Sequence, residues 1–166
     1  MRKIFCFITL LVILLSVPMT SMSQTPQQKR EKELRREAMV EQVVAVINAV
    51  RAKHNLPEVE PKRETSRVAQ IKAEDMLANS YYKHLSPTYG MPDAMLRKYN
   101  IRFTVSAENI AWAGVFCSTA EEVVEGWLDI TADKENLLNP DFTKIGVGFA
   151  ENPATRKYHW VVMLTD

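Results

Sequence analysis

The segment "KIGVGFAENPATRKYHWVVMLT", Lys144 to Thr165, decides the fold of this chain. It consists of two apolar runs, rich in β-branched and aromatic residues, on either side of a turn at Asn152 and Pro153. This pattern is typical of an antiparallel β-hairpin. We therefore predict that the chain closes with two adjacent antiparallel strands.

A third strand is predicted upstream, in "SAENIAWAG", residues 106–114. Because successive side chains of a strand point to opposite faces, Glu108, Ile110 and Trp112 lie on one side of it. Glu108 is the one charged residue in this run. We expect its carboxylate to be hydrogen-bonded, paired or metal-bound, because burying it alone costs on the order of several kcal/mol.

Two helices are predicted before these strands. Apolar residues at helical spacing, from Val40 onward, predict an amphipathic helix that Pro57 terminates. The second helix has an apolar face made of Ala69, Ala73, Met76 and Leu77. Three charged residues are expected mostly outside that face: Lys72, Glu74 and Asp75.

Two further helices follow. A short one is predicted from Pro92 to Tyr99, and a clearer one in "STAEEVVEGWL", residues 118–128. The second begins with a capping box, either Ser118 with Glu121 or Thr119 with Glu122. Helices first, a strand between them and a terminal hairpin predict a small α+β layered fold. Five residues are expected in its core: Trp127, Ile145, Val147, Phe149 and Trp160.

The N-terminus is typical of a secretory signal peptide. Residues 1–23 combine Arg2 and Lys3, an apolar run too short to span a bilayer, and small residues spaced like a peptidase site. We predict a signal peptide at 1–23, a charged, solvated leader at 24–39 and one domain at 40–166. The expected location is extracytoplasmic, secreted or periplasmic, with no stable membrane insertion after cleavage.

The net charge and the cysteine content limit which partners and which disulfide bonds the chain can have. Loss of Arg2 and Lys3 with the signal turns the formal net charge from +1 to −1. A near-neutral chain argues against nucleic acid or an anionic membrane as the main partner. Cys6 leaves with the signal, so Cys117 has no intramolecular disulfide partner. Beside Val115 and Phe116 it is interpreted as a buried, inert thiol.

The three histidines differ in their surroundings. His54 ends the first helix and is expected on the surface, and strand alternation makes His159 an exposed or edge residue. His84, in "YYKHLSP", occupies a loop, where functional residues are often held. The motifs of zinc peptidases, serine-hydrolase elbows, phosphate-binding loops and dinucleotide sites are missing from the sequence. Ser86 and Ser106 are weak nucleophile candidates, because closeness in sequence does not supply catalytic geometry.

Five segments in order resemble the CAP superfamily, which groups cysteine-rich secretory proteins, venom antigens and plant pathogenesis-related proteins, and this chain is most similar to its bacterial secreted branch. The resemblance covers residues 40–164 and implies an α-β-α sandwich with a central antiparallel sheet flanked by helices. The segments are "VVAVINAVRAKHNLP", "AQIKAEDMLANSYYKHLSP", "AENIAWAG", "EEVVEGWLDITADKENLLNPDFTKIGVGFA" and "YHWVVML".

The resemblance also implies a groove in which two histidines and two acids can hold a divalent metal. His84 matches the first histidine and Glu108 the first acid, while Asp133 stands in place of the second histidine and Ile130 in place of the second acid. His84, Glu108 and Asp133 remain acceptable donors for a weakly bound divalent cation. The other interpretation of Asp133 is a favourable residue at a helix N-terminus. Asn109 and Asn136 are expected to satisfy nearby backbone groups.

Three functions follow as hypotheses. The favoured one is a non-enzymatic module, with no required cofactor, that binds a lipid, a sterol-like molecule or a peptide in the groove of His84, Glu108 and Asp133 or in an adjacent apolar cleft. The alternative is a weak metal- or serine-assisted hydrolase, a peptidase or esterase, with His84 and Glu108 as its catalytic pair. Loss of the second histidine weakens catalysis more, because acid–base work needs paired groups whereas a cleft needs mainly shape. A purely structural role at the cell envelope is third.

Overall fold

The computed structural model describes residues 25–113, 119–152 and 154–166. Its sheet has the strand order β1-β3-β4-β2. Strands β2 (Ser106–Ala113), β3 (Lys144–Asn152) and β4 (Lys157–Thr165) pair antiparallel, which confirms the predicted hairpin and the predicted third strand. The short β1 (Glu60–Pro61) runs parallel to β3, so the sheet is mixed at one edge.

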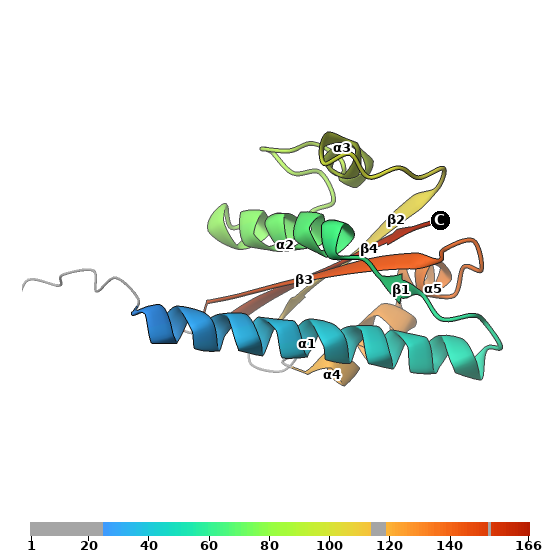
Figure 1. Cartoon of the computed structure of the whole chain (residues 1–166), viewed down its shortest axis with the longest axis horizontal. Coiled ribbons are helices and arrows are strands. Elements are labelled where there is room, and N and C mark those ends of the chain that lie inside the picture. Colours follow the sequence, from blue (N-terminus) through green and yellow to red (C-terminus); the bar gives the residue numbers. More distant parts are fainter. Residues whose placement is uncertain (1–24, 114–118, 153) are drawn as a thin grey trace, which may run out of the picture.

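Helices cover both faces of this sheet (Figure 1). Helices α2 (Arg63–Ala78) and α3 (Pro92–Lys98) lie on one face, and α1 (Pro26–Lys53), α4 (Ala120–Asp129) and α5 (Thr131–Leu137) lie on the other. The fold is therefore the expected α-β-α sandwich. It has two apolar layers, one on each side of the sheet, and all five predicted core residues are buried in the layer beneath α1 and α4.

Capping residues define where two helices begin. Thr25 and Gln28 form a capping box at the start of α1, and Thr119 and Glu122 form one at the start of α4. The second of the two boxes proposed for α4 is thus the one that forms. Each box satisfies two backbone N–H groups that have no partner inside the helix.

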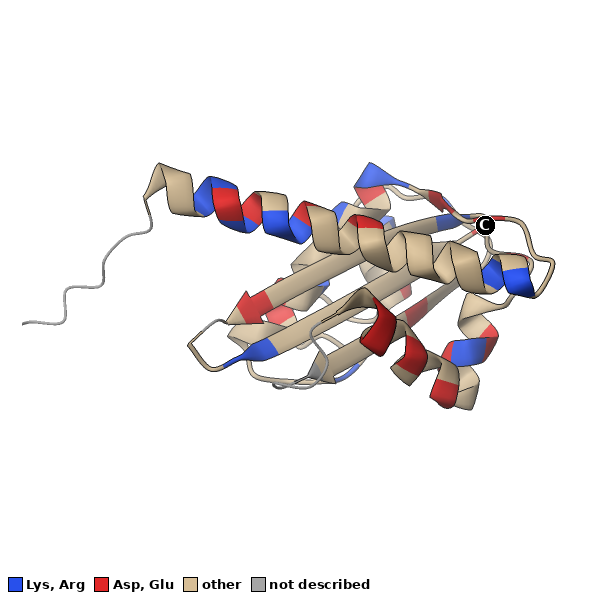
Figure 2. Ribbon diagram, turned by 90° about the horizontal axis from the view of Figure 1, so that it is seen from below, with Lys and Arg blue, Asp and Glu red and all other residues tan. Residues whose placement is uncertain are grey.

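The segment predicted as a solvated leader is helical from Pro26 onward. Lys, Arg and Glu residues are interleaved along this half of α1 (Figure 2), and its first buried residue is Val43. Helix continuity and two ion pairs, Arg35 to Glu151 on β3 at 3.6 Å and Arg36 to Glu74 on α2 at 4.0 Å, connect it to the domain. The predicted signal peptide and Cys117 lie outside the described residues.

The structure corrects the placement of two charged residues of α2. Lys72 and Asp75, expected mostly outside the apolar face, are buried, whereas Glu74 is exposed. Helix α2 lies so close to β3 that a Cβ on Gly146 or Gly148 would sit 2.3 Å from helix backbone atoms. Burial of the two charged residues is compensated by hydrogen bonds to the following loop, described below.

His159 is also corrected. It was expected at an exposed or edge position, but β4 is paired on both sides, with β2 and β3, and His159 is only 3% exposed. Strand alternation predicts on which face of the sheet a side chain lies, but not whether another element covers that face. In this fold, helices cover both faces. His54, by contrast, is exposed at the C-cap of α1, as expected.

Candidate functional site

His84 and Glu108 meet at the edge of the sheet. Glu108 lies on β2 with its side chain 2% exposed, and His84 lies on the loop between α2 and α3 with its side chain 51% exposed. The distance from His84 Nδ1 to Glu108 Oε2 is 2.7 Å. The predicted pairing of this histidine with this acid is therefore present, with the acid at the bottom and the imidazole open to solvent.

His84 and Glu108 each shift the pKa of the other. The hydrogen bond to Glu108 raises the pKa of His84, against the opposing effect of partial burial. Burial raises the pKa of Glu108, while the hydrogen bond from His84 and the charge of Lys72 oppose that rise. These opposing effects arise because a carboxylate removed from water needs donors or cations around it.

The two carboxylate oxygens of Glu108 differ in their surroundings. Oε1 is buried and has no hydrogen-bond partner within residues 25–113, 119–152 and 154–166. A buried acceptor without a donor costs free energy comparable to a lost hydrogen bond. Within the described residues, Glu108 therefore has one oxygen bonded to His84 and one buried oxygen without a donor.

Lys72 holds the loop that carries His84. Its buried ammonium donates to the carbonyls of Lys83, at 2.8 Å, and of His84, at 2.6 Å. Burial lowers the pKa of Lys72, and the charges of Glu108 and Asp75 raise it. The amine also lies 5.0 Å from the centre of the Tyr81 ring. Lys72 thus fixes the His84 backbone and places a positive charge behind Glu108.

Asp75 holds the same loop from the other side. Its carboxylate accepts hydrogen bonds from Asn79 at 2.8 Å, Ser86 at 2.6 Å, Thr88 at 3.0 Å and the Tyr81 hydroxyl. Burial by itself would raise the pKa of Asp75, but these hydrogen bonds outweigh it and leave the pKa below its usual value. The loop that presents His84 is therefore attached to α2 by two buried charges.

Ser86 belongs to this attachment. Its hydroxyl donates to Asp75 and accepts from the backbone N–H groups of Thr88, at 3.1 Å, and Tyr89, at 2.9 Å. Ser106 begins β2 opposite Thr165. Among the described residues, neither serine hydrogen-bonds to His84, so the geometry of a serine nucleophile with its base is not present there.

Asp133 approaches the site through α5. It lies in the first turn of that helix and is partly buried. Asn109 donates to its backbone carbonyl at 2.9 Å, which confirms the expected role of Asn109, whereas Asn136 donates to the side-chain oxygen of Asn109 at 2.8 Å. Burial raises the pKa of Asp133, and the charge of His84 opposes the rise.

The donor set does not fit a metal ion as arranged here. The described residues contain no group of three or more His, Cys, Asp or Glu side chains that could hold one. The predicted ligand set of His84, Glu108 and Asp133 is therefore not assembled into a metal centre. Asn109 binds the backbone carbonyl of Asp133, and Ile130, in place of the second acid, is 53% exposed and cannot ligate.

Tyr82 is a neighbour that the sequence analysis missed. Its hydroxyl donates to the carbonyl of Ile110 at 2.9 Å, and the indole N–H of Trp127 donates to the same oxygen at 2.9 Å. Burial, Asp133 and Glu108 raise the pKa of Tyr82. Tyr82, Lys72 and Asp75 all lie within about a dozen residues of His84, which is the one signal in the sequence that relates them to it.

Apolar side chains are exposed on every segment that carries a site residue. They lie in the loop of His84, on the strand of Glu108 and just before Asp133, and their exposed fractions range from 48% to 56%. These residues are Tyr82, Leu85, Trp112 and Ile130. Ionisable groups are thus flanked in the chain by exposed apolar surface, a combination typical of small-molecule sites.

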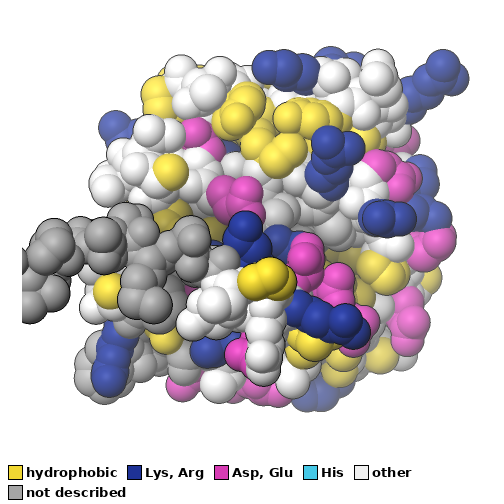
Figure 3. All heavy atoms as spheres, turned by 60° about the vertical axis from the view of Figure 1, so that its left-hand side comes forward, with side chains coloured by type: hydrophobic (Ala, Val, Ile, Leu, Met, Phe, Trp, Pro, Cys, Tyr) yellow, Lys and Arg dark blue, Asp and Glu magenta, His cyan; other side chains and the backbone are white. Residues whose placement is uncertain are grey.

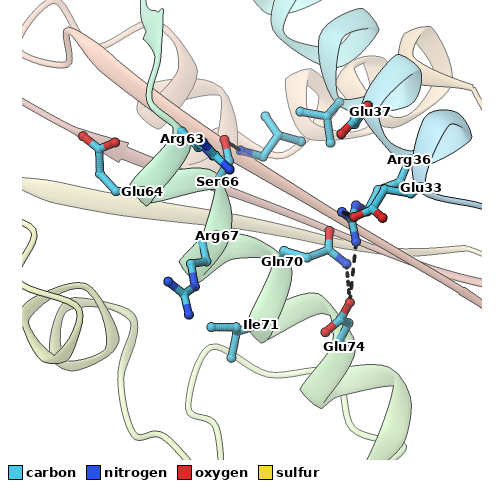
Figure 4. Close-up of a pocket in the computed structure, with 12 residues that line it drawn as sticks. Glu33, Arg36, Glu37, Arg63, Glu64, Ser66, Arg67, Gln70, Ile71 and Glu74 are labelled. Atoms are coloured by element: carbon cyan, nitrogen blue, oxygen red, sulfur yellow. Dashed lines mark hydrogen bonds and ion pairs between the residues drawn. The ribbon is translucent and has the colours of Figure 1, made fainter. Parts of the chain in front are cut away.

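A separate hollow of about 800 Å³ lies between α1 and α2 (Figure 4). Arg36 pairs there with Glu33 at 2.8 Å and with Glu74 at 4.0 Å. Gln70 exchanges two hydrogen bonds, both of 3.0 Å, with the backbone of Phe149 on β3. Because β1 covers only the start of β3, Gln70 satisfies part of the remaining edge. This hollow contains none of the predicted site residues.

The surface has no strong single-sign field on the face seen in Figure 3. Acidic and basic side chains lie next to one another there, and apolar side chains gather towards the top of that view. Within the described residues, no helix is both long enough and apolar enough to cross a bilayer.

The chain matches curated relatives over most of its length. It is 38% identical to YkwD of Bacillus subtilis over 115 residues, which are 69% of this chain and 44% of YkwD. It is 36% identical to the membrane protein YlbC of the same organism over 118 residues, which are 71% of this chain and 32% of YlbC. The chain therefore spans less than half the length of these relatives.

Solved structures have the same fold. An extracellular protein of Bacillus anthracis that contains an SCP domain superposes with a TM-score of 0.73 at 28% identity, covering 87% of this chain and 45% of that one. An outer surface protein of Borrelia burgdorferi superposes with a TM-score of 0.67 at 23% identity, covering 87% of this chain and 97% of that one. The second likeness concerns the fold alone.

The family model of the cysteine-rich secretory proteins matches residues 44–164, nearly the whole of the sandwich. This range contains both members of the His84–Glu108 pair and the two buried charges that hold its loop. The fold, the relatives and the family model agree, and the chain belongs to the CAP, or cysteine-rich secretory protein, family.

Proposed function

We propose that this CAP-domain chain is an exported binding module that takes up a small ligand in the groove at His84 and Glu108 without changing it chemically. The observation that carries the proposal is the buried Glu108 Oε1, which has no donor within the described residues. A ligand that donates a hydrogen bond to this oxygen removes the cost of leaving it unpaired.

The surroundings favour a ligand that is part polar and part apolar. Exposed Tyr82, Leu85, Trp112 and Ile130 offer apolar contact on the segments that carry the ionisable groups. Lys72 and Asp75 fix the loop before any ligand arrives, which lowers the entropic cost of binding. A lipid, a sterol-like molecule or an apolar peptide segment has the required combination.

Catalysis has less support. General acid–base chemistry requires a poised second group, and Asp133 stands where the family has its second histidine. Ser86, the nearest serine in sequence, is occupied by Asp75. We therefore place binding before hydrolysis.

Export is part of the proposal. The signal-like residues 1–23 agree with the description of the Bacillus anthracis protein as extracellular. Expression of the full chain in a bacterium, followed by N-terminal sequencing of the protein outside the cytoplasm, tests this part. We expect a chain that lacks residues 1–23, and an uncleaved chain confined to the cytoplasm would contradict export.

Ligand capture is tested by mass spectrometry of denaturing extracts from purified protein. Wild type, Glu108→Leu and the control Glu125→Gln, an exposed residue of α4, are produced side by side and shown to be folded by circular dichroism. We expect one compound to co-purify with wild type and the control and to be depleted from Glu108→Leu. Equal amounts in all three, or none in wild type, would count against the groove.

A further inference from the structure

The segment 82–105 forms a lobe around α3, which lies above α2 in Figure 1. It consists of most of the loop that carries His84, helix α3 and the chain that leads to β2. Met95 and Leu96 of α3 are fully buried in the apolar layer on this face of the sheet. Three partly buried rings of the lobe pack against the same layer: Tyr89, Tyr99 and Phe103. The lobe is therefore packed onto the domain and has a defined outer surface.

Basic side chains outnumber acidic ones on the lobe. Four basic residues and one acid give it a formal charge of +3: Lys83, Arg97, Lys98, Arg102 and Asp93. All five are exposed, and none forms an ion pair within the described residues. The net charge of −1 expected after signal cleavage therefore consists of +3 on the lobe and −4 on the rest of residues 24–166.

Aromatic rings lie beneath three basic side chains of this surface. In each case the charged group lies within about 6 Å of a ring centre, the range of a cation–π contact. The three contacts are Arg97 at 4.4 Å from Phe103, Lys98 at 5.3 Å from Tyr89, and Arg67 of α2 at 5.9 Å from Tyr99. All three basic side chains are nevertheless exposed. The rings thus position the charges without removing them from water.

Exposed apolar side chains lie next to these charges. Leu85 is 56% exposed and Met91 is 48% exposed. Ser86 and Gly90 exchange two backbone hydrogen bonds, of 2.9 and 3.0 Å, in an antiparallel bridge, so the flanking Leu85 and Met91 lie opposite each other across the turn. The ring beneath Lys98 belongs to the same turn. At the top of Figure 3, where the lobe lies, apolar and basic side chains are next to one another.

The opposite face of the sheet is acidic at α4. This helix packs in the other apolar layer and has four acidic residues and no basic one (Figure 2). The positive charge of the lobe and the negative charge of α4 thus lie on opposite faces of the sheet. Near an anionic surface, this separation favours the orientation in which the lobe approaches first.

We propose that the lobe docks the exported protein reversibly on an anionic phospholipid surface, with its basic side chains at the headgroup phosphates and Leu85 and Met91 at the acyl boundary. Basic residues beside exposed apolar ones are the combination by which peripheral proteins bind anionic bilayers. This mode of binding requires no helix that crosses the membrane. The lobe also carries His84, so docking brings the loop of the groove to the lipid surface.

An anionic bilayer fits this surface better than other anionic partners do. The near-neutral net charge argues against such a membrane only for a chain whose charges are evenly spread, and here they are separated. A soluble polyanion pairs with the bases but leaves Leu85 and Met91 in water, and lysine is depleted in interfaces between proteins. A bilayer accommodates both kinds of side chain, because headgroups and acyl chains meet within about 10 Å.

Co-sedimentation with vesicles tests the proposal. Protein that starts at Gln24, the product expected from signal cleavage, is mixed with vesicles of phosphatidylcholine alone or of equal parts of phosphatidylcholine and phosphatidylglycerol. We expect binding to the mixed vesicles to be at least about tenfold tighter, because each basic residue near an anionic surface contributes to it. This preference should disappear in about 1 M sodium chloride, where the Debye length is about 3 Å.

A matched pair of double variants tests the role of the basic residues. Lys98→Gln with Arg102→Gln removes two charges from the lobe, and Lys53→Gln with Lys134→Gln removes two exposed charges from α1 and α5. We expect the lobe variant to bind mixed vesicles more than about tenfold more weakly, since each basic residue accounts for about fivefold. The control should change binding by less than about threefold, because its charges lie far from the docked surface. Circular dichroism should show that both variants are folded.

A matched pair of single variants tests the apolar contact. Leu85 and Leu34 are 56% and 55% exposed, but only Leu85 belongs to the lobe. We expect Leu85→Ser to weaken binding to mixed vesicles at least about threefold, because an apolar side chain no longer reaches the acyl boundary. Leu34→Ser should bind as wild type does.

The outcomes decide between a membrane and other partners. Equal binding to the two kinds of vesicle, or equal binding by the two double variants, would overturn docking through the lobe. Binding to soluble polyphosphate that is as tight as binding to mixed vesicles, and insensitive to Leu85→Ser, would reassign the lobe to a soluble anion. Ligand capture in the groove is measured separately, by mass spectrometry of extracts, so its failure and a failure of docking can be told apart.

Discussion

The buried ammonium of Lys72 lies 2.6 Å from the carbonyl oxygen of His84, so a cation on α2 fixes the backbone of the loop that carries the imidazole. The same cation acts on Glu108, the acid that the imidazole contacts. One residue thus contributes to both the position of the loop and the charge of the site. Helix α2 therefore fixes the loop of the candidate site in addition to packing against the sheet.

Replacement of Lys72 by methionine should loosen this arrangement. The carbonyls of Lys83 and His84 lose their donor, and Asp75 and Glu108 lose a compensating charge. We expect a loss of about 3 kcal/mol in the free energy of unfolding, as for the breaking of other buried charge networks. Urea denaturation measures it. Lys53→Met, at an exposed position in α1, should change stability by less than about 0.5 kcal/mol.

Asp75 predicts a pH dependence of stability. Hydrogen bonds hold its folded-state pKa below the ordinary 3.8, so its stabilising contribution is complete above 3.8 and is lost as pH falls from there through the lower folded-state pKa. We expect Asp75→Asn to cost about 2 kcal/mol at pH 7 and clearly less at pH 3. Denaturation curves at both pH values test this, and a cost that is equal at both would contradict it.

Burial of His159 predicts a second pH dependence of stability. Burial, helped by the charge of Lys157, lowers its pKa below the ordinary 6.5. The unfolded chain therefore takes up a proton first, and stability falls as pH drops through 6.5. His159→Phe should remove that loss, so its stability relative to wild type should rise from pH 7 to pH 5. Exposed His54→Gln serves as the control and should follow wild type over this range.

Gly148 should tolerate no side chain. A Cβ there would lie 2.3 Å from the carbonyl carbon of Ala69 on α2, which is backbone and has no room to move away. We expect Gly148→Ala to cost about 3 kcal/mol, the upper end for overpacking. Gly126→Ala is the matched control, because nothing lies within 4 Å of its Cβ, and this helical position should gain about 0.5–1 kcal/mol. Thermal denaturation compares the two.

The elements of this fold could be predicted where the periodicity was strong. The hairpin of β3 and β4, the strand of Glu108 and the helix that begins at Thr119 all occur where their apolar patterns and caps indicate. The start of α1 could not be found this way, because its first half has few apolar residues. An exposed helix without an apolar face has no hydrophobic periodicity from which its start could be predicted.

The site could be predicted in part. A carboxylate in an apolar strand indicates by itself that a partner must exist, and the family resemblance identified His84 as that partner. Lys72, Asp75 and His159 were placed wrongly because burial depends on what covers a face, which local periodicity does not contain. Tyr82 was missed because its contact with Ile110 joins residues that are 28 positions apart.

The sequence by itself determined the α+β class, the strands β2, β3 and β4, the helices α2, α3 and α4, and the need of Glu108 for a partner. These follow from local periodicity and from the cost of burying a charge, both of which can be evaluated along the chain. The tertiary structure alone decided that Lys72 and Asp75 hold the His84 loop, that Asp133 forms no three-ligand site with the pair within the described residues, and that one oxygen of Glu108 has no donor among them. Hydrogen bonds and charge compensation depend on distances of a few ångströms between segments far apart in the chain, and those distances exist only once the layers have packed.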